Sequence, residues 1–184
     1  MTTWTFEPGH TAAEFCARHM MVTNVRGHFK NVRGTLKFNQ DNPHDSSVEV
    51  TIDAKEIWTG EPERDDHLRS ADFLDVENHP EITFNGDQVE IVGPHDYIVT
   101  GDLTIRGVTR QAILHVNYLG PWETPWWEDG KDKGPKTRAG FVAKTKINRH
   151  DFGVSWNSTL EKGGIVVGNM VEITIDAEAI LESS

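Results

Sequence analysis

Apolar and polar residues alternate along much of this chain with the period of two that is typical of β-strands. Val48, Val50 and Ile52 alternate with polar neighbours, as expected for a strand with one face in solvent. The same pattern predicts strands over residues 4–6, 11–18, 32–38, 47–54, 81–85, 88–92, 97–105, 110–119, 137–148 and 165–179. Glycine, proline and asparagine residues separate these segments, so we predict an antiparallel sandwich or barrel.

Turn signals refine this prediction. Pro8-Gly9 interrupts what otherwise reads as one strand from Trp4 to Arg18, and Asn85-Gly86 is a two-residue hairpin signal. Residues 121–135 are rich in glycine, proline and charge, which predicts a long hairpin loop. No internal repeat or linker divides the sequence, so we expect one domain over residues 1–184. Closure into a barrel would leave no strand edge exposed.

One segment departs from the β pattern and predicts a short helix near residues 62–75. Pro62 suits the first position of a helix, and the acidic residues around it suit the positive end of a helix dipole. Leu68, Phe73 and Leu74 would form the apolar face of this segment. The sequence therefore predicts a short amphipathic helix that connects two strands.

Four motifs resemble those of the YceI-like family. Residues 15–29 are similar to its pattern F-x-x-x-H-M-x-V-x-x-V-x-G-x-F, and residues 64–84 to its R-D-x-H-L, D-F-L-D and I-T-F motifs. Residues 101–109 resemble G-x-L-T-I-x-G-V-T, and residues 149–153 resemble R-x-D-F-G. The resemblance implies an all-β, antiparallel, up-and-down, lipocalin-like β-barrel of about eight strands. It also implies binding, storage or transport of a polyisoprenoid, an isoprenoid quinone or a fatty-acid amphiphile, with no cofactor besides this lipid.

The residues expected to face the barrel interior are mainly large and apolar, with Ala13, Gly34 and Gly101 among them. Such a wall can enclose an alkyl chain or fill a core, and the residues alone leave both open. Met20 would suit a cavity mouth or the gap beneath a loop, because its side chain adapts to irregular apolar shapes. The residues predicted to contact the lipid or close the barrel ends are Phe15, Met20, Val22, Phe29, Leu36, Phe38, Val50, Ile52, Ile57, Leu68, Phe73, Phe84, Leu103, Ile105, Phe141, Phe152 and Trp156.

Polar residues within the motifs are candidates for contacts with a lipid headgroup or for clamps at the barrel end. An arginine can make two parallel hydrogen bonds to a carboxylate, so Arg64 with Asp65, and Arg149 with Asp151, are candidate clamps. The full set of candidates is His19, Arg64, Asp65, His67, Arg149 and Asp151.

A metal-assisted hydrolase is an alternative function for the acidic segment. Asp65, Asp66, His67, Asp72 and Asp75 bring carboxylates and an imidazole together within eleven residues. No second histidine falls at the i+4 position of a metal-binding helix, and acidic residues at a helix start already suit its dipole. We therefore expect no catalytic residues and no metal.

The net charge of −11 and the isoelectric point near 5.2 exclude nucleic acid as an expected partner, because no basic stripe is evident. The same balance disfavours docking on anionic lipid headgroups. No stretch approaches the roughly 20 apolar residues of a membrane-spanning helix, and the first ten residues lack the features of a signal peptide. We expect a cytoplasmic protein, although many members of the YceI-like family are secreted to the periplasm. The single cysteine, Cys16, excludes an internal disulfide and suits a reducing compartment.

Trp122, Trp126 and Trp127 fall within the predicted loop over residues 121–135. Exposed tryptophans would suit a partner protein, a second subunit of a homodimer or a membrane interface, whereas packing on the barrel would need no partner. A stress-linked interaction module with a filled barrel is therefore a further alternative.

Overall fold

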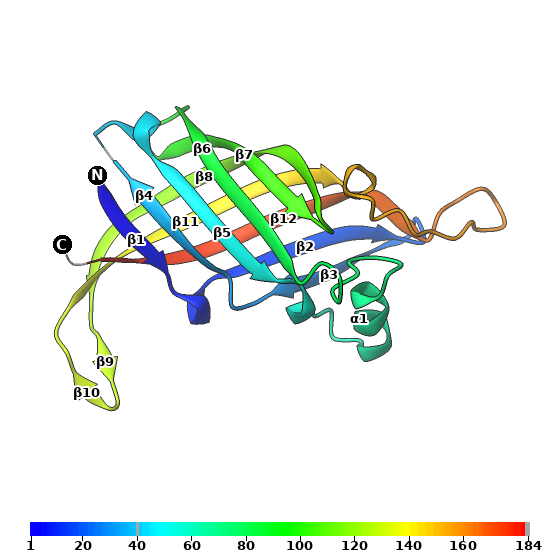
Figure 1. The fold of residues 1–184 in the computed structure, drawn as a ribbon, viewed down its shortest axis with the longest axis horizontal. Coiled ribbons are helices and arrows are strands. Elements are labelled where there is room, and N and C mark those ends of the chain that lie inside the picture. Colours follow the sequence, from blue (N-terminus) through cyan, green and yellow to red (C-terminus); the bar gives the residue numbers. More distant parts are fainter. Residues whose placement is uncertain (40, 183–184) are drawn as a thin grey trace.

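The structure is a computed structural model that describes residues 1–39 and 41–182 (Figure 1). One α-helix, α1, spans Pro62–Arg69, and short 3-10 helices span Pro8–His10, Pro43–Asp45, Ala54–Glu56 and Arg149–Phe152. The strands of the described residues are β1 (Thr2–Phe6), β2 (Ala12–His19), β3 (Thr23–Phe29), β4 (Arg33–Phe38), β5 (Ser47–Asp53), β6 (Glu81–Ile91), β7 (Asp96–Ile105), β8 (Val108–Thr124), β9 (Trp127–Glu128), β10 (Lys131–Asp132), β11 (Lys136–Asn148) and β12 (Val167–Leu181).

The strands close into an antiparallel barrel with eight strand positions around its circumference. Pairing runs β1-β4-β5-β6-β7-β8-β11-β12, and β12 returns to β1. The strands β1 and β2 lie one after the other along β12, where Trp4 pairs with Leu181 and Phe15 with Ile173. On their other side, β1 pairs with β4 and β2 with β3. The expected interrupted first strand and the lipocalin-like, up-and-down barrel with one short helix are thus confirmed. The helix ends at Arg69 and not near residue 75, so Phe73 and Leu74 lie in the turns that follow it.

Alternation places the apolar side of each strand inside the barrel. On β7, Tyr97, Val99, Leu103 and Ile105 are buried, and each is separated from the next by at least one more exposed residue. Burial of such residues removes apolar surface from water and stabilises the closed sheet. The core therefore forms an inner lining around the barrel axis.

The hairpin predicted at Asn85-Gly86 is wrong. Strand β6 continues through these residues, and its register with β7 shifts between Gly86 and Gln88. Gly86 pairs with Gly101, and a Cβ at Gly101 would lie only 2.3 Å from the Asn85 carbonyl oxygen. Two glycines here permit a close approach of backbones at a β-bulge, and the turn to β7 comes at residues 92–95.

Two other segments differ from the pattern-based prediction. The pattern does not predict strand β3, because only Val25 and Phe29 are large apolar residues on its one apolar face and Gly27 lies between them. The predicted loop over residues 121–135 is largely strand: β8 continues to Thr124, and β9 and β10 form a small separate hairpin (Figure 1).

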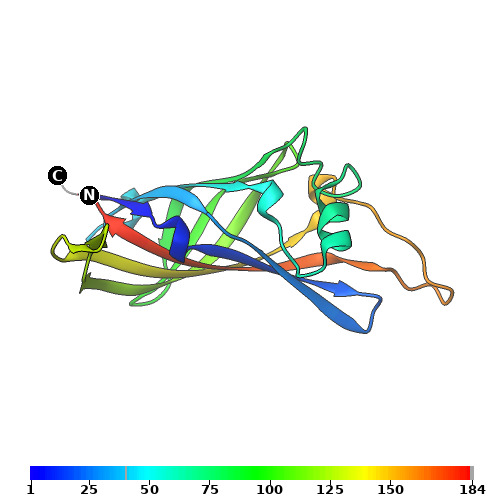
Figure 2. The ribbon, with the colours of Figure 1, turned by 90° about the horizontal axis from the view of Figure 1, so that it is seen from below.

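The two ends of the barrel differ. Helix α1 lies at the end where β2 joins β3 and where β11 and β12 are connected, whereas the N-terminus lies at the opposite end (Figure 2). Among the described residues, no helix combines the length and apolar character needed to cross a bilayer.

Candidate functional site

The barrel encloses a cavity of about 280 Å³ with an almost entirely apolar wall. Side chains from β1 through β8 and from β11 and β12 contribute to it, so the cavity follows the inner face of the barrel. Of the residues predicted to contact a lipid, those on its wall are Phe15, Phe29, Leu36, Phe38, Val50, Ile52, Ile57, Leu68, Phe73, Phe84, Leu103, Ile105, Phe141 and Phe152.

Three residues of the predicted set do not line the cavity. Met20 and Val22 lie in the β2–β3 turn, with 43% and 78% of their surface exposed. Trp156 is half-buried and packs at the helix end, with its ring centroid 5.3 Å from that of Phe73. Their proximity to family motifs suggested an inward position, but the turn and the loop after the 3-10 helix at Arg149 carry them away from the barrel axis.

Much of the wall was missed by the sequence reasoning. Many of the missed residues lie on β8, β11 and β12, among them Leu114, Val116, Ala143, Thr145, Ile147, Val171, Ile173, Ile175 and Ala177. Their alternation within three predicted strands was the available signal. The glycines were also misjudged: a Cβ at Gly34 would lie 2.2 Å from the Glu49 carbonyl oxygen, so this glycine accommodates a neighbouring strand and does not widen the cavity.

The α1 end of the cavity is closed by the helix and the turns that follow it. Leu68 from α1, and Phe73 and Leu74 from the following turns, line the cavity. The buried Asp65 carboxylate accepts hydrogen bonds from the Thr59 backbone N–H and hydroxyl, and Arg64 donates to the hydroxyl and carbonyl oxygens of Thr59. The expected clamp of Arg64 with Asp65 therefore acts through Thr59, and neither charged residue lines the cavity.

Two further arginines connect segments at the α1 end through hydrogen bonds to backbone carbonyls. Arg106, in the β7–β8 turn, donates to the carbonyl oxygens of Ala71 at 2.7 Å and of Phe73 and Gly153 at 3.0 Å. Arg69 donates at 2.8 Å to the carbonyl oxygens of Lys55 and Ile57. Sequence reasoning gave neither arginine a role, because their partners are backbone carbonyls that no motif reveals.

Arg149 is a buried cation on the cavity wall. Only 5% of its surface is exposed. It donates hydrogen bonds to four carbonyl oxygens, those of Val154 (2.7 Å), Trp156 (2.9 Å), Gly168 (3.0 Å) and Val167 (3.2 Å). Within residues 1–39 and 41–182, no ion pair involves Arg149, and the candidate partner Asp151 is exposed. Burial lowers the pKa of the Arg149 guanidinium below its ordinary value, because desolvation disfavours the charged form.

The acidic groups near α1 pair separately. His67 Nε2 lies 2.9 Å from Asp72 Oδ2, Asp66 accepts from Arg69 at 3.0 Å, and Asp75 accepts from Asn78. This segment therefore lacks the convergent carboxylates that the hydrolase alternative requires. The remaining polar candidate, His19, is half-buried and pairs with Val167 at the end of β2.

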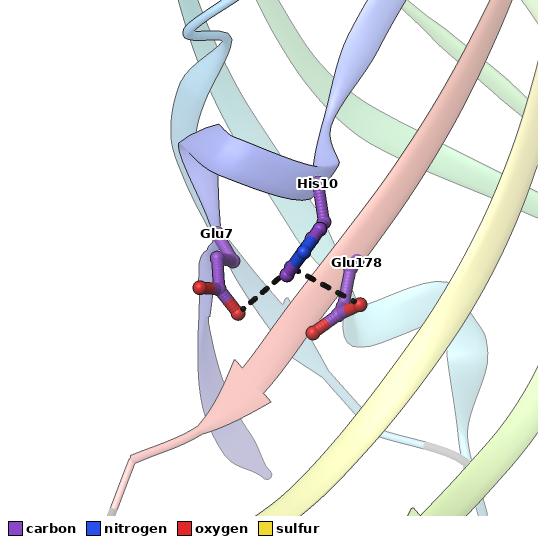
Figure 3. A group of neighbouring side chains, drawn as sticks. All are labelled: Glu7, His10 and Glu178. Atoms are coloured by element: carbon purple, nitrogen blue, oxygen red, sulfur yellow. Dashed lines mark ion pairs between the residues drawn. The ribbon is translucent and has the colours of Figure 1, made fainter. Parts of the chain in front are cut away.

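A different group of titratable side chains lies where β1 gives way to β2 (Figure 3). His10 Nδ1 lies 3.4 Å from Glu7 Oε2 and 3.7 Å from Glu178 Oε2. Arg138 Nε lies 2.6 Å from Glu178 Oε1, and Arg138 Nη2 lies 3.6 Å from Glu7 Oε2. Arg138 on β11 already pairs with both carboxylates. The cluster therefore links β11, β12 and the segment between β1 and β2 through ion pairs.

Comparison with known proteins identifies the family. The YceI-like domain model matches residues 4–179. The chain belongs to the YceI-like family. It is 38% identical over 148 residues to protein YceI of Escherichia coli, a match that covers 80% of this chain and 73% of that protein.

Solved structures agree with this YceI-like fold. The Campylobacter jejuni YceI protein matches with a TM-score of 0.71 and 27% identity, over 90% of each chain. BcnA of Burkholderia cenocepacia matches with a TM-score of 0.79 and 20% identity, over 94% of this chain and 98% of that one. A domain of Saccharophagus degradans, described as polyisoprenoid-binding, matches with a TM-score of 0.68 and 13% identity, over 99% and 100%.

Three of the motifs that resemble YceI-like proteins meet at the α1 end. The segment over residues 64–84 contains most of α1, and residues 101–109 contain the β7–β8 turn. Residues 149–153 contain the 3-10 helix that carries Arg149. The hydrogen bonds of Arg106 connect these three segments. The motifs therefore build one closed end of the barrel, while the apolar wall is spread over its strands.

Proposed function

We propose that this protein binds one long-chain apolar molecule inside its barrel, for storage or transport. The observation that carries the proposal is the enclosed cavity, whose apolar wall extends from Leu68 and Phe73 at the α1 end to Phe38 and Phe141 towards the opposite end. The description of the S. degradans domain as polyisoprenoid-binding supports an isoprenoid ligand; an isoprenoid quinone or a fatty-acid amphiphile would suit the same wall.

The strength of such binding follows from the area removed from water. Each buried methylene is worth about 0.8 kcal/mol, so about ten buried carbons would contribute about 8 kcal/mol before the cost of ordering the chain. An apolar wall with few polar groups gains this energy for almost any flexible alkyl or prenyl chain. Chain length and a polar end would therefore determine the specificity.

We further infer that the polar end of the ligand lies towards Arg149. This guanidinium is buried on the wall, and its four hydrogen-bond partners are neutral carbonyls. A carbonyl, carboxylate or phosphate oxygen would interact favourably with this charge, since the low dielectric of the interior strengthens the attraction. A ligand with such a polar end would therefore bind more tightly than the bare hydrocarbon.

Native mass spectrometry of gently purified protein, followed by organic extraction, tests the proposal. We expect about one long-chain amphiphile per chain, and saturable rebinding of a prenyl probe after extraction. Among probes of equal chain length, a prenyl phosphate should bind more tightly than the corresponding hydrocarbon. A protein that neither carries nor takes up any such chain would contradict the proposed function.

We also propose that the protein acts by binding and not by catalysis, without a resident metal ion. The side chains of the acidic segment already have separate partners, with His67 paired to Asp72 and Asp66 to Arg69. The alternative, a metal-assisted hydrolase, would need one equivalent of metal in the untagged protein, which elemental analysis would detect.

A further inference from the structure

The tip of the β2–β3 hairpin exposes three consecutive apolar residues at the α1 end of the barrel. Met20, Met21 and Val22 have 43%, 56% and 78% of their surface exposed. Figure 2 shows this hairpin projecting from the barrel body beside α1. A Cβ added at Gly164 would lie 3.3 Å from Met21 Cγ, so the neighbouring loop approaches Met21 at a residue without a side chain.

The backbone of this turn does not favour the residues that occupy it. Met20 and Met21 have φ angles of 46° and 64°, and the Val22 backbone N–H donates to the His19 carbonyl oxygen at 3.1 Å. Two successive positive φ angles normally select asparagine and glycine, because a larger side chain is strained there. Neither turn geometry nor burial therefore accounts for two methionines at the tip.

The strand segments next to the tip carry two arginines and no acidic residue. Residues 15–29 contain Arg18 and Arg26 and neither aspartate nor glutamate, within a chain of net charge −11. Arg18 and Arg26 are exposed on β2 and β3, behind the apolar tip. The facing loop adds Glu161 and Lys162, which are both exposed and cancel each other in charge. The outer part of this hairpin is therefore locally basic within an acidic chain.

We propose that this hairpin tip docks on the surface of a bilayer that contains anionic lipids. Met20, Met21 and Val22 would enter the boundary between headgroups and acyl chains, while Arg18 and Arg26 pair with lipid phosphates. The exposed acidic residues Glu61, Glu63 and Asp66 belong to α1 and its N-cap at the same end of the barrel, and physiological salt screens their repulsion beyond about 8 Å. Docking would hold the α1 end of the cavity at the membrane. The inference goes beyond the proposed function and does not depend on it.

Vesicle cosedimentation with the double variant Met20→Asn, Met21→Gly tests the docking surface. These residues suit the turn, so the melting temperature should stay equal or rise. Binding to vesicles of phosphatidylcholine with phosphatidylglycerol should weaken by about tenfold or more, because two apolar side chains no longer enter the bilayer. Opposite effects on stability and binding would rule out unfolding as the cause.

Two further double variants show whether vesicle binding depends on the hairpin tip or on another part of the surface. Trp122→Ser with Trp127→Ser removes exposed apolar residues elsewhere on the surface and should leave vesicle binding unchanged. Arg18→Gln with Arg26→Gln should weaken binding to the anionic vesicles and reduce its dependence on salt. Wild-type protein should bind vesicles of phosphatidylcholine alone more weakly.

Three outcomes would overturn the proposal: absence of wild-type binding to anionic vesicles, undiminished binding by the methionine variant, or loss of binding only in the tryptophan variant. Uptake of farnesol without vesicles reports the barrel separately and should be the same in every variant. Failure of that uptake with vesicle binding intact would reject the proposed function and leave the docking surface standing.

Discussion

Arg149 illustrates how a single buried charge can organise the end of a barrel. Its planar donors join the 3-10 helix, the following loop and the start of β12 through carbonyl oxygens of Val154, Trp156, Val167 and Gly168. Two of these carbonyls follow Arg149 closely in the sequence, and the other two belong to β12. Removal of the guanidinium would leave several of them without a partner, which is more costly than the net value of each hydrogen bond.

Replacing Arg149 with methionine should therefore destabilise the protein strongly. We expect a loss of about 3 kcal/mol or more, since several buried acceptors lose their donor. Urea denaturation measures the change. Arg110→Met is the matched control: Arg110 is exposed and donates to the neighbouring Thr109 carbonyl, so its change should stay within about 0.5 kcal/mol. Equal stability of both variants would contradict the role given to Arg149.

Gly101 lies where two strands approach so closely that no side chain fits. A Cβ at this position would meet the Asn85 carbonyl oxygen at 2.3 Å and the Gly86 Cα at 2.5 Å, and neither atom belongs to a movable side chain. Gly101→Ala should therefore cost about 1–3 kcal/mol. At Gly9 the added Cβ meets nothing within 4 Å, so Gly9→Ala should be neutral or stabilise by up to about 1 kcal/mol. Thermal unfolding of the two variants compares these effects, and a tolerated Gly101→Ala would show that the strands can separate.

At the scale of elements, alternation and turn chemistry were sufficient to predict most strands, because a strand with one buried face repeats every two residues. The helix start at Pro62 could likewise be predicted. The pairing of strands across the sheet could not be predicted from these patterns. For this reason Asn85-Gly86 was assigned to a turn, although it forms a bulge against Gly101. The same limit applies to the motifs: they contain Arg106 and its acceptors in Ala71, Phe73 and Gly153, but nothing in the sequence shows that these residues pair.

The segment that contains α1 provides a test of binding against catalysis. His67 stacks edge-on against Phe73 and Trp156 and pairs with Asp72. His67→Asn should lower stability by about 1 kcal/mol, through lost packing and the lost contact with Asp72, without removing a metal. Elemental analysis and denaturation of the same preparation measure both quantities. One equivalent of metal in the wild-type protein, absent from the variant, would instead favour the hydrolase.

At the scale of the whole molecule, structural motifs and the cavity wall occupy different parts of the barrel. Three of the motifs lie together at the α1 end. The hydrogen bonds donated there by Arg106 and Arg149 require an arginine at each of these positions. The wall needs only apolar side chains of suitable size, which many residues can supply. Candidate wall residues were therefore predicted mainly where a motif marked them. Most of those on β8, β11 and β12 had only the alternation of their strands as a signal, and the closed barrel shows which of their faces lines the cavity.

The cavity itself can be tested by filling it from a wall position that has room. Ala143 lines the cavity from β11, and its neighbour Lys144 points outwards. If the cavity holds a lipid, Ala143→Phe should occupy part of that space, change the stability of the lipid-free protein by less than about 1 kcal/mol and weaken prenyl binding by about tenfold or more. Lys144→Phe adds the same ring outside the barrel and should leave binding unchanged.

Stability and binding must be measured on the same lipid-free preparation, because a ligand bound only to the folded state raises the apparent stability by mass action. A close-packed core would respond differently to Ala143→Phe. The ring would then force neighbouring side chains from their preferred rotamers and cost about 1–3 kcal/mol, with prenyl binding unaffected. That combination would place the ligand elsewhere and contradict the proposed function, whereas reduced binding with retained stability would show that the lipid and the introduced aromatic ring compete for one space.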